Sequence, residues 1–261
     1  MKGFMILGLA ILLTGIVSSN VYAHDLWVTA DNYNPKVNEE ITISLEWGHL
    51  FPGSESIEVD RIERMYLISP DGKEVPLEIK AEGEKELVAP VKMKLEKSGT
   101  YLVVVEKKSY FATLTTGGYK KQSKKGLEGI IWSYWVESCP AKAIINVSAA
   151  SGNSFQKENN QRYQLIPLDN PVNLKEGDYL CVKVTLDGKP YSNIVYATYA
   201  GFSSENDTFA YTTRTNKDGI AKIRILKPGI WLVKAHDEIP YSDSKEADNY
   251  YFTSTLTFEI K

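Results

Sequence analysis

Histidine and cysteine are both scarce in this sequence of 261 residues, which contains three histidines and two cysteines. The lack of a histidine-rich segment argues against a metal-storage protein. The two cysteines, Cys139 and Cys181, have no close spacing and therefore make a poor zinc motif. The residues that could bind a metal or attack a substrate are few enough to be considered one at a time.

Motifs of common enzyme classes are missing as well. The chain has no glycine-rich phosphate loop and no Gly-x-Ser-x-Gly nucleophile elbow. A serine or cysteine triad would need one of the three histidines, and no sequence context supports that arrangement. The formal net charge is −3, whereas nucleic-acid binders carry basic surfaces. We therefore expect a protein that is not an enzyme and has no nucleic-acid partner.

Long windows with helical periodicity are also absent, and short alternating runs take their place. Between residues 41 and 47, branched and aromatic residues alternate with polar ones, which predicts a strand with one buried face. Further strands are predicted at residues 65–68, 101–105, 110–115, 143–147, 180–186, 194–198, 221–226, 230–235 and 252–260. The pattern predicts an all-β protein.

The two halves of the chain resemble each other. Residues 97–103 and 227–233 both begin with a lysine, continue through a glycine turn, and enter a predicted strand of aromatic and branched residues. This favours two immunoglobulin-like β-sandwiches in tandem, at residues 24–148 and 163–261, joined by a polar linker at 149–162. The alternative is that such phrases occur in any all-β protein.

The first 23 residues are typical of a secretory signal peptide. Lys2 is followed by an apolar run at residues 4–16, and Val21-Tyr22-Ala23 offers a small residue for cleavage. An uncleaved membrane anchor is the alternative, but the apolar run is short for a span of about 20 residues. We expect export and no stable membrane insertion once the leader has been removed.

Cleavage after Ala23 would make His24 the first residue of the mature protein. Its α-amine and ring Nδ1 could then chelate one metal ion. His49 and His236 follow predicted strands, where loops from distant parts of a sandwich can meet. Together the three residues offer four nitrogens, which suits nickel, cobalt or copper. Solvated loop histidines are the alternative interpretation, and nearby carboxylates that could join or orient the site are those of Asp25, Glu46 and Asp237.

The two cysteines predict one disulfide in an exported protein. Cys181 lies on the side of its strand opposite to the apolar residues, so it could meet Cys139 at the junction of the halves. A pair of metal thiolates is the less favoured alternative. Residues 130–135, an aromatic-rich run, are expected to pack in a core or at a sheet edge, with a partner groove as the other interpretation.

Several short motifs of this sequence resemble motifs of a known family, and they occur in the same order along the chain. They are Ala-His-Asp-Leu-Trp at 23–27, Trp-Gly-His at 47–49, Ala-Lys-Ala at 141–143, Gln-Leu-Ile-Pro-Leu-Asp-Asn-Pro at 164–171, Thr-Asn-Lys-Asp-Gly at 215–219 and Lys-Pro-Gly-Ile-Trp-Leu-Val at 227–233, followed by His236. The sequence resembles a periplasmic component family associated with nickel and cobalt uptake, a family often filed as a domain of unknown function. The resemblance implies a β-rich periplasmic protein that binds a transition metal beside a membrane metal transporter. It also implies His24, His49 and His236 as ligands.

The leading hypothesis is thus a periplasmic nickel- or cobalt-binding protein that passes the ion to an uptake system. A periplasmic copper carrier is an alternative, because Cu(II) outranks Ni(II) at nitrogen sites. A histidine-brace copper oxygenase acting on polysaccharide is a further alternative. A structural adhesion module of tandem sandwiches, with incidental histidines, is the last.

Overall fold

The computed structural model describes residues 24–53 and 55–261. Within these ranges the protein is all-β, as predicted, apart from three single-turn 3₁₀ helices at Val59–Arg61, Ser154–Gln156 and Pro171–Asn173. No helix in this part of the chain is long and apolar enough to cross a membrane. The predicted signal peptide, residues 1–23, lies outside the described residues.

One large sheet of 11 strands forms the middle of the described structure. Eight strands follow one another in space: β10 (Gly118–Lys120), β9 (Tyr110–Thr115), β11 (Ile130–Val136), β20 (Asn249–Ile260), β12 (Pro140–Val147), β8 (Gly99–Lys107), β3 (Ile62–Ile68) and β4 (Glu74–Pro76). The remaining three are β19 (Gly229–Pro240), which pairs with β20, then β16 (Ile194–Tyr199) and β17 (Tyr211–Arg214).

Strand β20 joins the two halves of the chain. It pairs with β19 in antiparallel fashion over its whole length, and with β11 and β12 in parallel fashion. Strands of the first and second halves therefore share one hydrogen-bonded sheet, and a count of two tandem sandwiches is not confirmed. The boundary at residues 149–162 stays a prediction, although Phe155 from this segment is buried in a core shared by both halves.

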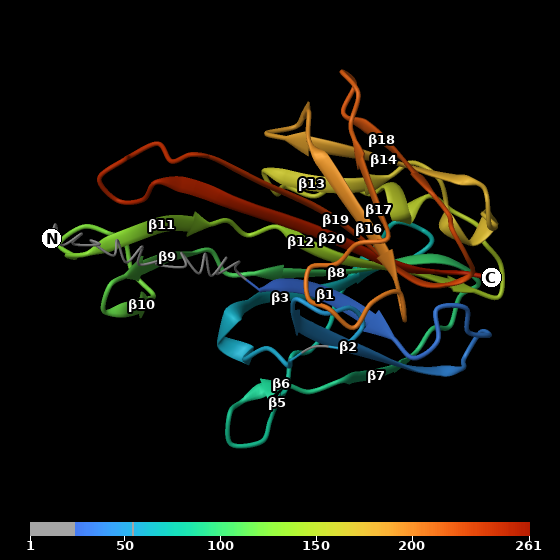
Figure 1. The fold of residues 1–261 in the computed structure, drawn as a ribbon. Helices are drawn as coiled ribbons and strands as arrows, with labels where there is room; N and C mark the ends of the chain where they lie inside the picture. The colour runs from blue at the N-terminus through green and yellow to red at the C-terminus, as the bar shows by residue number, and fades with distance from the viewer. Residues whose placement is uncertain (1–23, 54) are drawn as a thin grey trace, which may run out of the picture.

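Two smaller sheets cover opposite faces of the large one (Figure 1). One contains β1 (Asp25–Ala30), β2 (Glu40–Gly48) and β7 (Val91–Lys94). The other contains β13 (Tyr163–Pro167), β14 (Tyr179–Leu186), β15 (Lys189–Pro190) and β18 (Ile220–Arg224). A short hairpin of β5 (Ala81–Glu82) and β6 (Leu87–Val88) stands beside the first. Strands β9, β10 and β11 reach beyond these layers as an arm (Figure 1).

The central strand β8 shows why the middle sheet is buried on both faces. Leu102 and Val104 pack in the core under β13, β14 and β18, whereas Val103 and Val105 pack in the core under β1 and β2. Successive side chains of a strand point to opposite faces. A run of valines without polar interruption is the composition expected of a strand covered on both sides.

Strand β1 is held against β20 by two threonine hydroxyls. Thr257 Oγ1 donates to the carbonyl of Val28, and Thr255 Oγ1 donates to the carbonyl of Leu26 at 2.6 Å. Both threonines are buried, so these bonds satisfy groups that water cannot reach. They also fix the register of β1 on the sheet, and therefore the position of the residue that precedes it, His24.

The predicted disulfide is wrong, since Cys139 and Cys181 are both free thiols. Cys139 is buried in the core beneath β14. On β14, Leu180 and Val182 face that core, and Cys181 points to the outer face as predicted. The sheet itself thus separates the two sulfur atoms.

Candidate metal centre

His24 and His49 lie side by side because of the pairing of β1 with β2. Asp25 at the start of β1 is opposite Gly48 at the end of β2. The residue before β1 and the residue after β2 are therefore neighbours, and their ring centroids are 4.8 Å apart at 70°. The His24 ring is also nearly perpendicular to the Trp47 ring, at 89° and a centroid distance of 5.7 Å.

His49 is oriented by a carboxylate from a distant loop. Its Nδ1 lies 3.2 Å and 3.3 Å from the two carboxylate oxygens of Asp207. The backbone N–H of Asp207 also donates to the carbonyl of His49 at 3.0 Å, which anchors the loop between β16 and β17 on this residue. A hydrogen on Nδ1 that points to the carboxylate leaves Nε2 with the lone pair that a metal needs.

His236 is oriented in the same way by the backbone. Its Nδ1 is 2.8 Å from the carbonyl oxygen of Phe252. A carbonyl can only accept, so Nδ1 carries the hydrogen, and Nε2 is again the nitrogen with a lone pair. Nε2 lies 3.9 Å from Oε1 of Glu238, and the ring packs on Tyr251 at a centroid distance of 4.4 Å.

The register of β1 on the sheet places His236 level with His24, the residue that precedes β1. Thr257 contacts Val28 and Thr255 contacts Leu26, so each step of two residues along β20 matches two residues along β1. By the same spacing, Thr253 would lie level with His24. Thr253 is the strand partner of His236, which brings His236 to the same end of the layers as the other two histidines.

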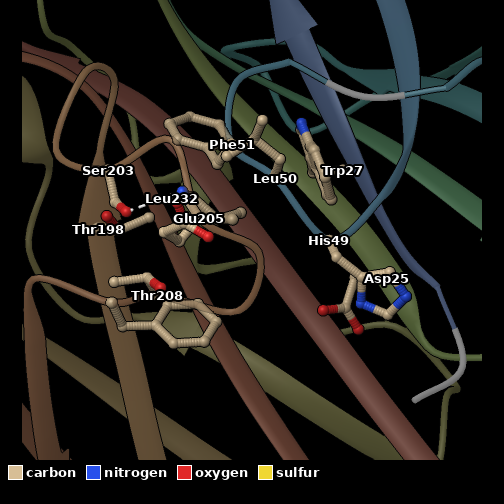
Figure 2. A pocket seen from close by; sticks show the side chains of 11 residues that line it. Asp25, Trp27, His49, Leu50, Phe51, Thr198, Ser203, Glu205, Thr208 and Leu232 are labelled. Atoms are coloured by element: carbon tan, nitrogen blue, oxygen red, sulfur yellow. Dashed lines mark hydrogen bonds between the residues drawn. The ribbon is translucent and has the colours of Figure 1, made fainter. Parts of the chain in front are cut away.

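Asp25 is the neighbour that the three histidines have in common. It interacts electrostatically with His24 and with His236, and it lines one small pocket together with His49 (Figure 2). Its Oδ2 accepts a hydrogen bond from Lys234. Its Oδ1 is buried and has no hydrogen-bond partner among the described residues. An orphaned carboxylate oxygen beside imidazoles is a group that a bound cation would satisfy.

Sequence comparison places the chain in a family. A family model, described as a domain of unknown function (DUF4198), matches residues 21–238. The chain belongs to the DUF4198 family. Among curated proteins, none matches the sequence significantly.

Comparison with solved structures gives only weak overlaps for this DUF4198 protein. The D0-D1 domain of intimin is 16% identical with a TM-score of 0.23, covering 88% of this chain and 96% of that one. Murine CEACAM1b is 8% identical with a TM-score of 0.23, covering 91% and 100%. The adhesin InvE of Yersinia pseudotuberculosis is 14% identical with a TM-score of 0.24, covering 90% and 60%. Overlaps this low are no basis for transferring a function.

The other carboxylates suggested by the sequence of the DUF4198 chain are engaged elsewhere. Asp237 Oδ2 accepts a hydrogen bond from the Tyr191 hydroxyl at 2.8 Å. Glu46 Oε1 lies 3.4 Å from the Thr29 hydroxyl. The carboxylate that does orient a histidine is Asp207, which sequence reasoning missed. It lies in the loop between β16 and β17, where no sequence pattern marks it.

Burial favours the neutral form of two of the rings. Burial lowers the pKa of His24 below its usual value, and the neighbouring His49 lowers it further. Burial also lowers the pKa of His236, with the Lys234 ammonium as the second cause. Neutral imidazoles have free lone pairs, so these two rings need not lose a proton before they bind a metal.

Among the side chains of residues 24–53 and 55–261, no three histidines, cysteines or carboxylates form a complete metal-binding group. The donors of the DUF4198 chain are two imidazoles in contact and a third on β19 of the large sheet. The α-amine of His24 exists only after cleavage. Imidazole and amine nitrogens are donors that nickel, cobalt and copper accept.

Proposed function

We propose that this protein binds nickel or cobalt after export to the periplasm and passes the ion to a membrane uptake system. His24 would bind through its α-amine and Nδ1, and His49 and His236 would each bind through Nε2. The observation that supports this most is the arrangement of hydrogen bonds on the last two rings. Each engages Nδ1, with Asp207 or with the Phe252 carbonyl, and so leaves Nε2 for a metal.

This arrangement is the one that metal-binding histidines generally show. A partner on the second ring nitrogen fixes the tautomer and raises the basicity of the nitrogen that binds. A carboxylate does this for His49 and a backbone carbonyl for His236. Histidines without a function do not need such partners. If the three histidines of the chain were incidental, we would also not expect all of them at one end of the sheets.

The donor set also suits a carrier. Nitrogen ligands exchange a metal ion more readily than a cage of thiolates does, and neither cysteine belongs to the group. Cys139 is buried in the core and Cys181 faces outward from β14. Because His24 begins the mature chain, one side of the site would open and release the ion when that residue moves. We place the carrier beside a membrane metal transporter on the strength of the sequence resemblance.

Calorimetric titration of nickel into protein that begins at His24 tests the proposal. We expect one ion to bind per chain. His24→Ala and a variant with one glycine added before His24 should each weaken binding at least about tenfold, because each loses the chelate of amine and imidazole. Asp237→Asn is the matched control, since that carboxylate is bonded to Tyr191, and it should bind nickel like the unmodified protein. Unchanged nickel affinity in both His24 variants would contradict the assignment.

Copper is the alternative cargo that the same donors favour. Cu(II) outranks Ni(II) at almost any nitrogen site, so affinity alone does not define the physiological metal. Competition between buffered copper and nickel, together with elemental analysis of protein isolated from the periplasm, separates the two. Copper as the sole metal in the isolated protein would favour the copper carrier.

A further inference from the structure

A large cleft lies directly beside His24. Its volume is about 580 Å³, and His24 forms part of its wall. We call it the aromatic cleft after its five ring side chains, which are Trp47 from β2, Tyr110 from β9, Tyr119 from β10, and Trp132 and Tyr134 from β11. The cleft therefore lies between the layer of β1 and β2 and the arm of β9, β10 and β11.

Ring contacts join the wall of the aromatic cleft to His236. The Trp132 and Tyr134 rings are 4.9 Å apart between centroids, and Tyr134 is 5.6 Å from Tyr251. Tyr251 in turn packs on His236 at 4.4 Å. A molecule lying against Trp132 and Tyr134 would thus touch the same group of rings that holds a proposed metal ligand.

The aromatic cleft is too large for an ion with water alone. An ion with a full shell of water occupies roughly 200 Å³, counting about 30 Å³ for each water. Pockets for small organic molecules are typically about 300–1,000 Å³, with apolar walls and a few polar groups. The described side chains also do not form a complete metal-binding group. An external molecule could supply the donors that the protein lacks, on the side where His24 faces the cleft.

The charges in the lining are balanced. Arg61 and Lys85 supply two cations, and Glu55 and Glu58 supply two carboxylates. Arg61 is held by Glu58, with Nε donating to Oε2 at 2.8 Å, and its guanidinium lies 6.0 Å from the Trp47 ring. A strongly anionic molecule would be repelled by the two carboxylates. A molecule with both an amine and a carboxylate matches both kinds of group.

We propose that the metal enters as a complex with an amino-acid chelator, whose body occupies the aromatic cleft while His24 binds the ion. The inference rests on the proposed function. The carboxylate of the chelator would lie toward Arg61 and Lys85, and its side chain would pack against Trp132 and Tyr134. The complex would be recognised as a unit, since the ion touches the histidines and the organic part touches the arm.

Native mass spectrometry and calorimetry can test this with three probes. They are nickel chloride alone, the nickel complex of L-histidine, and nickel citrate, which carries carboxylates but no amine or ring. We expect a ternary mass of protein, nickel and one L-histidine, and a dissociation constant for that complex about tenfold below that for nickel citrate. If L-histidine merely withdraws nickel from the protein and no ternary mass forms, the inference is wrong.

Variants of the aromatic cleft separate this inference from the proposed function. Lys85→Gln should weaken binding of the L-histidine complex about tenfold, with the affinity for nickel alone unchanged. Trp132→Ala should weaken binding of the L-histidine complex by more than it changes the affinity for nickel alone. Lys85 is an exposed loop residue, so its substitution keeps the test valid even if Trp132→Ala does not fold. Tyr179→Ala, an exposed aromatic on β14, is the control and should change neither affinity.

The outcomes differ for the two proposals. Nickel binding without a ternary complex contradicts the inference and leaves the metal-binding function standing. Binding of the L-histidine complex without binding of nickel alone supports the inference. A protein that binds none of the three probes contradicts both.

Discussion

The carboxylate of Asp25 accepts a hydrogen bond from the ammonium group of Lys234, and both side chains are buried next to the histidines. Lys234 lies on β19 and Asp25 at the start of β1, so this ion pair ties the start of β1 to the large sheet. A buried pair is costly to break by removing one partner, because the other charge is left without compensation.

We expect Lys234→Met to lower the free energy of unfolding by about 3–5 kcal/mol, since it leaves the Asp25 carboxylate buried and unpaired. The double variant Asp25→Asn with Lys234→Met removes both charges and should recover much of that loss. Urea denaturation of the two single variants and the double variant at pH 7 gives the coupling between the residues. Additive losses in the double variant would mean that the pair is not coupled.

The large sheet shows how far sequence patterns reach in this protein. The run at residues 101–105 predicts a strand, and β8 is there. The run does not reveal that alternate valines serve two different cores, because no local signal says how many layers cover a strand. The parallel pairing of Ala141 with Thr255 joins residues far apart in sequence, and only the folded chain shows it. Phe155 is a large apolar residue in the polar segment predicted to be a linker. Its presence there indicates that this segment packs against a core, which the linker interpretation did not consider.

The candidate metal centre was foreseeable in part. His24, His49 and His236 were all expected to meet. The rings of His24 and His49 are in contact, whereas the ring of His236 packs on Tyr251. Lys234 is a charged residue within the apolar run at 230–235, on the same strand face as His236, which is a readable sign of a buried ion pair. Asp207 had no such sign, because an acidic residue in a polar loop is normally a solvated one. Its role depends on a backbone bond between two loops, which composition cannot show.

A second prediction concerns Lys142, which lies on β12 and is buried, with Nζ 3.2 Å from the Leu165 carbonyl. Burial lowers the pKa of Lys142 to about 8 from its usual 10.5. Between those two values the unfolded chain holds one proton more than the folded chain, so this residue makes the protein more stable as the pH rises. Below pH 8, Lys142 is protonated in both the folded and the unfolded chain, so the buried charge lowers the free energy of unfolding by a constant amount.

Replacing Lys142 with methionine should therefore raise the free energy of unfolding at pH 7, on the order of 1–3 kcal/mol. The advantage over the unmodified protein should shrink as the pH approaches 9.5, at no more than about 1.4 kcal/mol per pH unit. Comparing the two proteins at each pH cancels the titration of tyrosines and of Cys139. A constant difference from pH 7 to 9.5 would show that Lys142 does not lose its proton in this range.

The two free thiols lead to a third prediction. Cys139 is buried, and burial raises its pKa to about 12, so it should not react with Ellman's reagent in the folded protein. Cys181 is partly exposed and should react slowly, because burial and Asp169 raise its pKa. Denatured protein without reductant should show both thiols. A disulfide closing a loop of about 40 residues would contribute roughly 3–4 kcal/mol, so a clear fall in melting temperature with dithiothreitol would contradict the free pair.

The last prediction concerns the orientation of His49. Asp207→Ala removes the carboxylate that faces Nδ1, so the ring could rotate or take the other tautomer, and nickel binding should weaken about 10- to 100-fold. Asp207→Asn keeps a carbonyl oxygen that can accept from Nδ1 and should weaken binding less.

Glu205→Gln is the matched control for Asp207, because Glu205 is a carboxylate of the same loop and lines the small pocket that contains His49. It should leave nickel affinity unchanged. An equal loss in the Glu205 and Asp207 variants would mean that the loop acts through its overall negative charge. A loss confined to Asp207→Ala, with partial recovery in Asp207→Asn, would show that the hydrogen bond to Nδ1 holds the ring with Nε2 directed at the ion.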